Sequence, residues 1–160
     1  MGVAGSGKSL IGAALATRLG FEFVEGDAYH PPANIAKMAA GIPLEDVDRR
    51  DWLDSLAGVL HEARRADRGV VLSCSALKRS YRDALRHGDP DVCFVFLRGP
   101  RALLAERLAS RTGHFMPTSL LDSQLDTLEE PADDEKAVVC DIGDAPRPIV
   151  DRLILLLSCA

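Results

Sequence analysis

Residues 2–9 read GVAGSGKS, which fits the G-x-x-x-x-G-K-S pattern of a loop that wraps around nucleotide phosphates. Glycines let the backbone curl so that successive N–H groups point at phosphate oxygens, and the helix that follows adds its positive dipole end. We expect Lys8 to reach the β- and γ-phosphates and the Ser9 hydroxyl to bind Mg²⁺. A glycine-rich turn that matches by chance is the alternative, which the amphipathic segment directly after the loop disfavours. The predicted nucleotide site comprises Gly2, Val3, Ala4, Gly5, Ser6, Gly7, Lys8 and Ser9.

Three further features favour a small-molecule kinase over a GTPase switch or an ATPase. Asp27 follows an apolar strand pattern, at the strand end where open α/β sheets bind ligands, and could accept a proton or a hydrogen bond from an attacking hydroxyl or hold Mg²⁺ through water. A surface turn aspartate is the alternative. The stretch RLASRTGHFMP, rich in Arg, His and Gly, could close over the phosphates and exclude water. No NKxD-type guanine-reading element is present.

The elements that must position these residues alternate along the chain. Short apolar runs predict strands, and apolar residues at helical spacing predict helices between them. This alternation indicates one α/β domain over residues 1–160, with a parallel sheet flanked by helices. Together with the phosphate loop and the stretch rich in Arg, His and Gly, it predicts a P-loop kinase fold with a lid at about 111–119. Expected strands are 21–25, 70–73, 92–97 and 137–142, and expected helices are 9–19, 33–40, one capped by Asp48 and stopping at Gly69, 78–86, 101–111, 119–129 and 148–158.

The strand that normally leads into a phosphate loop is missing from this pattern, because only Met1 precedes Gly2. That strand is central in this fold class, with parallel neighbours on both sides. Without it, the four remaining strands are not expected to form one continuous sheet. We therefore expect about five to eight further residues before Met1 in the native protein, rich in Val, Ile or Leu, which is an ordinary strand length.

Composition excludes several other classes. The net charge of −5 is not that of a nucleic-acid-binding chain, and the apolar run LILLLSCA is too short to cross a membrane. The four cysteines are scattered without a CxxC pair, which argues against a zinc or redox site. Cys93 and Cys140 lie in apolar runs typical of reduced, buried thiols, and we expect a cytoplasmic protein.

Three long stretches, GDAYHPPANIAKMAAGIPLEDVDRRDWL, SCSALKRSYRDALR and GHFMPTSLLDSQLDTLEEP, resemble the gluconokinase family. The resemblance runs from Gly2 to about Pro131 and implies ATP-dependent phosphorylation of D-gluconate at its 6-hydroxyl, with ATP and Mg²⁺ as cofactors. It also implies a fold related to shikimate kinase and the nucleoside monophosphate kinases. Family members are often dimers, so a homodimer is a further expectation.

Candidate substrate contacts follow from the acid that this family phosphorylates. Arg49, near a helix start, could grip a carboxylate bidentately, whereas Arg50 would point elsewhere. Lys37 could face the same crevice or be a solvated helix residue. His30, pinned by the prolines that follow it, could bind sugar hydroxyls or serve in packing or capping. Ser75 and Lys78 follow a buried strand and lie beside the phosphates.

The remaining candidates are mostly basic. Arg82 could supply charge to substrate or phosphate, or belong, like Lys78, to a solvated basic helix. Arg107 and Arg111 fall on one helical face, and we expect Arg107 to stack on adenine and Arg111 to reach the phosphates as the lid closes. His114 is a weaker lid candidate. Gln124 belongs to the family-like stretch, but its residue type indicates no role.

Two rival readings remain. Shikimate and adenylylsulfate kinases share the loop but not GDAYHPPAN or GHFMP. The alternative from another class is a nucleotide-binding regulatory protein that has lost catalysis, which would bind nucleotide without gluconate-dependent ADP release.

Overall fold

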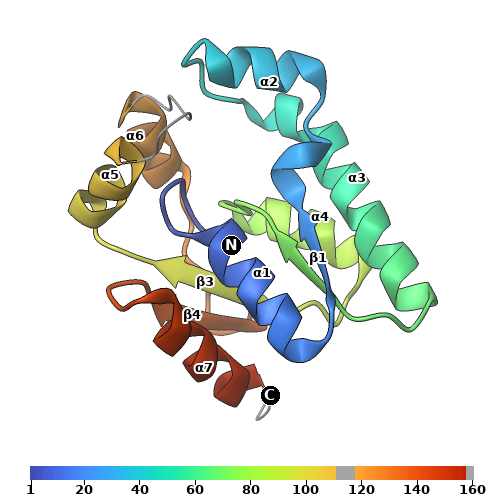
Figure 1. Ribbon diagram of the computed structural model, residues 1–160. Helices are drawn as coiled ribbons and strands as arrows, with labels where there is room; N and C mark the ends of the chain where they lie inside the picture. The colour runs from blue at the N-terminus through green and yellow to red at the C-terminus, as the bar shows by residue number, and fades with distance from the viewer. Residues whose placement is uncertain (111–117, 158–160) are drawn as a thin grey trace.

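The structure is a computed structural model of the 160-residue chain and describes residues 1–110 and 118–157. Helices and strands alternate, which confirms the α/β prediction (Figure 1). In chain order the elements are α1 (Lys8–Leu19), β1 (Glu22–Glu25), the 3₁₀ turn η1 (Gly26–Tyr29), α2 (Pro32–Ala39), α3 (Asp46–Arg65), β2 (Val70–Ser73), α4 (Arg79–Gly88), β3 (Phe94–Arg98), α5 (Arg101–Ala109), α6 (Thr118–Thr127), β4 (Ala137–Asp141) and α7 (Pro146–Leu157).

The strands form two parallel pairs. β1 pairs with β2 from Glu22 opposite Val70 to Glu25 opposite Ser73, and β3 pairs with β4 along its whole length. Within the described residues, no ladder joins β2 to β3. The expected break in the sheet is therefore confirmed, while the expectation of residues before Met1 stays a prediction.

Met1 and Gly2 bridge the two strand pairs. The Met1 carbonyl accepts a hydrogen bond from the N–H of Leu97 at 3.0 Å, and the N–H of Gly2 donates to the carbonyl of Ser75 at 3.1 Å. Beside this bridge lies an apolar cavity of about 460 Å³, lined by residues of β2, β3 and α1 that include Leu72, Val95 and Leu15. The start of the phosphate loop is thus tied to the ends of both pairs.

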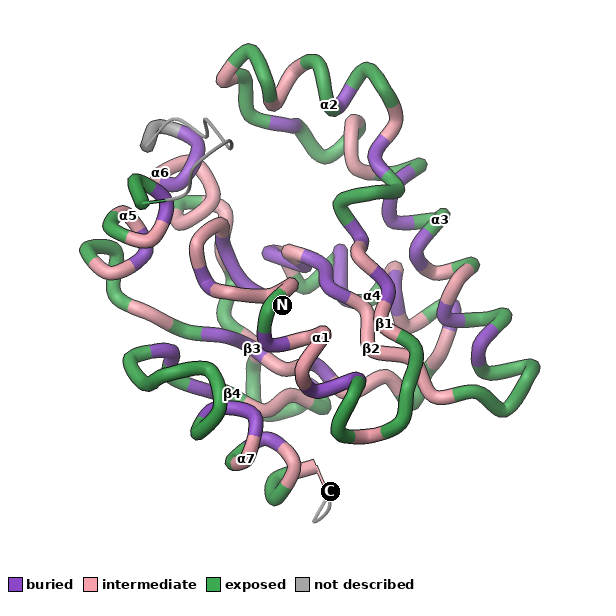
Figure 2. The backbone as a smooth tube through the Cα atoms, in the orientation of Figure 1, coloured by how far each residue is buried: buried purple, intermediate pink, exposed green. Residues whose placement is uncertain are grey.

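The core lies between the strands and the helices that cover them (Figure 2). α1 packs against β1, β2 and α7, and α3 packs against α4. α3 buries Trp52, Leu56, Leu60 and Ala63, which recur at helical spacing on one face. In Figure 1 the loop before α1 lies between α2 on one side and α5 with α6 on the other, and this defines the space in which the candidate site is built.

Some element ends differ from expectation. α3 begins at Asp46, so Asp48 is its third residue rather than its cap, and the Asp48 carboxylate accepts from the backbone N–H of Glu45 at 2.8 Å. α3 ends at Arg65, before Gly69, and Asp67 just beyond has a left-handed φ of 52°. Leu10, in the first turn of α1, is 60% exposed. Cys140 is buried, and Cys93 is only partly buried.

Candidate active site

The phosphate loop has the backbone shape that its glycines predict. Gly5 and Gly7 have φ values of 80° and 88°, in the left-handed region that favours glycine. A Cβ on Gly5 would also come within 2.8 Å of the Leu104 carbonyl on α5. Gly7 caps α1, whose first turn carries no carboxylate, so the positive end of the helix faces the loop without a competing anion.

Two side chains of the loop suit a phosphate ligand. The hydroxyl of Ser6 is buried and has no hydrogen-bond partner among the described residues, an arrangement that costs free energy unless a ligand satisfies it. The ammonium of Lys8 donates to the carbonyl of Val3 at 3.0 Å and so lies across the loop. Ser9 is half-buried in the first turn of α1. The loop therefore fits the phosphates of a nucleotide.

Asp27 lies on the 3₁₀ turn that ends β1, and the turn is fixed by Gly26. A Cβ at Gly26 would lie 2.1 Å from the Ser73 carbonyl, so the close approach of β1 and β2 requires glycine. The Gly26 carbonyl accepts from the indole N–H of Trp52 at 2.7 Å, and its N–H donates to the Ser73 hydroxyl at 3.2 Å. The Ser73 hydroxyl in turn donates to the carboxylate of Glu25. Asp27 thus projects from a rigid turn with 68% of its side chain exposed.

His30 packs beside Asp27 rather than facing open solvent. Its ring stacks on Trp52, with centroids 4.2 Å apart and planes 14° apart, and its Nε2 lies 4.0 Å from Asp27 Oδ1. Burial lowers the pKa of His30, the main effect on it, which favours the neutral ring. Asn34, 3.5 Å from His30 Nδ1, donates to the carbonyl of Asp48 at 2.6 Å. Packing is therefore observed, and sugar binding by His30 stays a prediction.

A cluster of charges surrounds Tyr81 where α3 and α4 begin. The guanidinium of Arg49 lies 5.5 Å from the centre of the Tyr81 ring, and the ammonium of Lys78 lies 5.6 Å from it. Lys78 donates to both carboxylate oxygens of Asp46, at 2.7 and 2.8 Å, and the Tyr81 hydroxyl donates to the same carboxylate. The hydrogen bond from Lys78 is the largest cause that lowers the pKa of Asp46.

Of the candidate substrate residues, Arg49 and Lys78 lie at Tyr81, and Lys37 pairs with an aspartate at the start of α3. Arg49 donates to the carbonyl of Leu44, which holds its side chain at the start of α3, while Arg50 is exposed, as expected. The Lys37 side chain is 41% exposed, and its ammonium lies 2.6 Å from the Asp48 carboxylate, which ties α2 to α3. Contact of Lys37 with a substrate stays a prediction. Ser75 is half-buried beside Gly2.

Both sequence interpretations of Arg82, as a substrate or phosphate contact and as a solvated helix residue, are wrong. Its side chain is 0% exposed and that of its partner, Glu135, is 1% exposed, so it is neither solvated nor available to a substrate. The guanidinium binds Glu135 bidentately at 2.6 and 2.7 Å and donates to the carbonyls of Ala76, Leu77 and Glu129. The amphipathic pattern of α4 contained a signal for burial of position 82, since Tyr81 and Leu85 are buried on the same helix.

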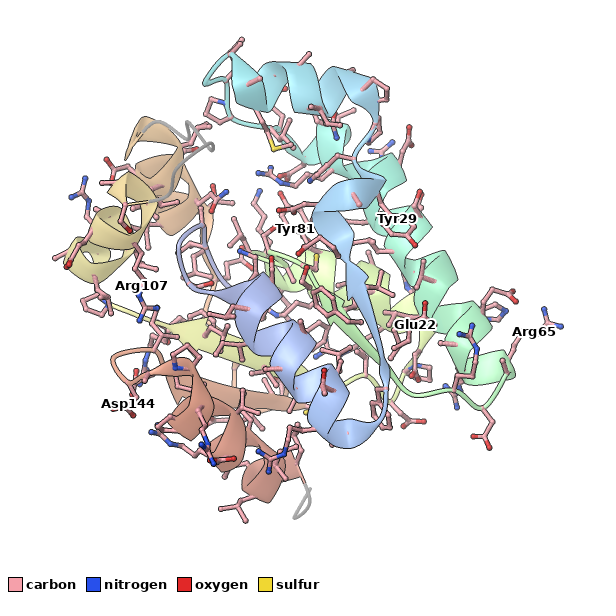
Figure 3. The ribbon with its side chains drawn as sticks, viewed as in Figure 1. Glu22, Tyr29, Arg65, Tyr81, Arg107 and Asp144 are labelled. Carbon is pink, nitrogen blue, oxygen red and sulfur yellow. The ribbon has the colours of Figure 1, made fainter. Side chains whose placement is uncertain are left out.

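Arg107 and Gln124 lie on α5 and α6, which are on the other side of the phosphate loop from α2 (Figure 1). Arg107 donates to the carbonyl of Ile142 at 2.7 Å and so reaches from α5 to the loop after β4, near Asp144 (Figure 3). Gln124 on α6 accepts a hydrogen bond from the N–H of Ala4 at 2.7 Å. Sequence reasoning gave Gln124 no role, because a contact across 120 positions leaves no local signal. Arg111 and His114 lie outside the described residues.

A phosphate loop that opens a helix beside parallel strands, with a carboxylate at the end of the next strand, defines the P-loop kinase class. The family described as "AAA domain" matches residues 1–131. Gluconokinase of Gluconobacter oxydans is 51% identical over 154 residues, which cover 96% of this chain and 86% of the relative. The crystal structure of a gluconokinase from Sinorhizobium meliloti is 49% identical, with a TM-score of 0.86 over 99% of this chain and 93% of that one. The chain belongs to the gluconokinase family.

More distant structures agree on the fold. Shikimate kinase from Bacteroides thetaiotaomicron superimposes with a TM-score of 0.68 over 99% of this chain and 96% of that one, at 20% identity. This likeness confirms the expected relation in fold and carries no inference about substrate. Among the described residues, no helix is both long and apolar enough to span a membrane.

Proposed function

We propose that this protein is a gluconokinase, which transfers the γ-phosphoryl group of ATP to the 6-hydroxyl of D-gluconate and releases ADP. The observation that carries the proposal is the pairing of a phosphate loop with a cationic cluster, Arg49 and Lys78, around Tyr81. A sugar acid needs both features, because one end of it reacts with a nucleotide and the other end is a carboxylate. The names of the relatives point to the same substrate.

Asp27 is the proposed base. Its exposed carboxylate would accept the proton of the 6-hydroxyl as the oxygen forms a bond to the γ-phosphorus and the bond from that phosphorus to the bridging oxygen of ADP breaks. The rigid turn held by Trp52 and Ser73 keeps the carboxylate in one place, which lowers the entropic cost of alignment.

The phosphate loop would bind the β- and γ-phosphates through its N–H groups, with the ammonium of Lys8 leaving the Val3 carbonyl to neutralise developing negative charge. Mg²⁺, when bound at the Ser9 hydroxyl and the phosphates, would supply further positive charge at the transferred group. Arg107, beside the loop after β4, is the proposed adenine contact. Arg111 is the proposed cation on the phosphates from the lid.

The carboxylate of gluconate is proposed to bind Arg49 bidentately. Arg49 is already held near Tyr81 and the start of α3, where the helix dipole also favours an anion. Lys78 and Lys37, each paired with an aspartate of α3, would add positive charge at the rim of the site. His30 and Ser75 are proposed to contact hydroxyls of the substrate.

A panel of sugar acids, together with shikimate, tested for ATP turnover in an assay coupled to ADP formation, decides the proposal. We expect gluconate to give the highest kcat/KM and shikimate to give none. Nucleotide binding without turnover on any sugar acid would instead support the regulatory alternative. We further propose that the protein is cytoplasmic and forms a homodimer. Sedimentation of the purified protein would test the oligomeric state.

A further inference from the structure

The hydrogen bond from the N–H of Ala4 to the Gln124 side chain joins the phosphate loop to α6. Its length of 2.7 Å is short for a neutral N–H···O contact, and Gln124 is half-buried. Because a backbone N–H only donates, the side-chain oxygen of Gln124 must face the loop. The contact therefore fixes both the Ala4 peptide and the orientation of the Gln124 amide.

α6 is itself held at its middle and just beyond its end. At the middle, Asp122 binds Arg101 of α5 bidentately, at 2.7 and 2.9 Å. Just after its end, the N–H of Glu129 donates to the carbonyl of Leu77 at 2.8 Å, and its carbonyl accepts from the buried guanidinium of Arg82 at 2.9 Å. Gln124 is thus carried on a helix that cannot shift without breaking these contacts.

Together these contacts form a closed series that includes the start of the phosphate loop. The loop begins at Gly2, which donates to Ser75, two residues before the Leu77 carbonyl that holds Glu129. The series then returns through α6 and Gln124 to Ala4. Consequently, the first part of the phosphate loop is held from two sides by segments that are far apart in sequence.

We propose that Gln124 is a positioning residue that holds the phosphate loop in its ATP-binding shape. With the Ala4 peptide fixed, the peptides from Gly5 to Lys8 follow at φ values set by the two left-handed glycines, so their N–H groups converge without rearranging on binding. A glutamine suits this position because it is a neutral acceptor, whereas a carboxylate at the same place would repel the polyphosphate. This inference rests on the proposed function only in naming ATP as the ligand.

The test compares variants at position 124 by direct binding of ATP in the absence of gluconate. Gln124→Met keeps the length of the side chain and removes the acceptor, so we expect the Kd for ATP to rise about fivefold, the value of one neutral hydrogen bond. The affinity for adenosine, which carries no phosphate, should stay within twofold, and so should the KM for gluconate at saturating ATP. Asp126→Asn, an exposed change on the same helix, is the matched control and should leave ATP binding unchanged.

Gln124→Glu tests whether the acceptor must be neutral. It keeps an oxygen for Ala4 but adds a negative charge, so its loss of ATP affinity should shrink as ionic strength rises, whereas that of Gln124→Met should not. An ATP affinity within twofold of the parent in Gln124→Met, or an equal loss of adenosine affinity, would overturn the proposal. Failure of the parent to phosphorylate gluconate while these ATP effects hold would overturn the proposed function alone.

Discussion

The guanidinium of Arg82 and the carboxylate of Glu135 form a bidentate ion pair that is almost completely removed from water, with N–O distances of 2.6 and 2.7 Å. The remaining donors of Arg82 bind three backbone carbonyls, and Glu135 also accepts from Arg86 and from the N–H of Ala132. This pair joins α4 to the loop after β2 and to the segment after α6. The ion pair therefore holds these segments together and is not available to bind a substrate.

Removing one member of this pair should be severely destabilising. Arg82→Met leaves the Glu135 carboxylate buried without its bidentate partner, and we expect the free energy of unfolding in urea to fall by ~3–5 kcal/mol. Arg79 lies on the same helix as Arg82 and forms an exposed ion pair with Asp134. Arg79→Met breaks this pair and should change the free energy of unfolding little. Equal effects of the two substitutions would show that burial of the Arg82 pair contributes no stability.

The same pair predicts how stability depends on pH. The hydrogen bonds from Arg82 are the main cause that lowers the pKa of Glu135 from 4.5 to about 2 in the folded chain. Because this pKa is lower in the folded state than in the unfolded state, the contribution is fully present above about pH 4.5 and is lost as pH falls toward 2. Urea unfolding of the parent should therefore show stability dropping across this window, and the drop should be smaller in Glu135→Gln. A parallel pH dependence in both proteins would contradict the assignment.

Asp27→Asn tests the proposed base. The amide keeps the size of the side chain but cannot accept the proton, so we expect kcat to fall by about 10²–10⁴-fold, the usual contribution of a positioned base. The KM for ATP should change far less if Asp27, on the turn after β1, serves the acceptor hydroxyl as proposed. Weakened ATP binding with kcat retained would instead place Asp27 on the nucleotide or its metal ion.

Local patterns predicted the fold well and the site only in part. The phosphate loop and the strands are local features, and β2 has the expected bounds, Val70–Ser73. The absence of a ladder between β2 and β3 in the described residues also agrees with expectation. By contrast, the start of α3 was misplaced because Asp48 has the residue type of a cap, while the backbone already turns helical at Asp46.

Contacts between distant segments were the part that the sequence could not supply. The basic character of α4 indicated a solvated or ligand-binding Arg82, but its partner lies 53 positions away and only folding brings the two together. The same applies to Gln124 and Ala4, and to Asp46, whose carboxylate binds Lys78 and Tyr81 from another helix. Residue type indicates what a side chain can bind, whereas its actual partner depends on packing.

Arg49→Lys tests the proposed grip on the substrate carboxylate. Lysine keeps the charge but presents a single point donor instead of a planar fork, so the KM for gluconate should rise more than that for ATP, by about tenfold if one charge-assisted hydrogen bond is lost. The measurement compares gluconate with its uncharged reduced analogue, in which an alcohol replaces the carboxylate. The substitution should reduce the discrimination between the two compounds. Arg50→Lys, at the exposed neighbouring position, is the control and should leave that ratio unchanged. An unchanged ratio in Arg49→Lys would place the carboxylate elsewhere, with Lys78 as the next residue to substitute, because its ammonium lies a similar distance from the same Tyr81 ring.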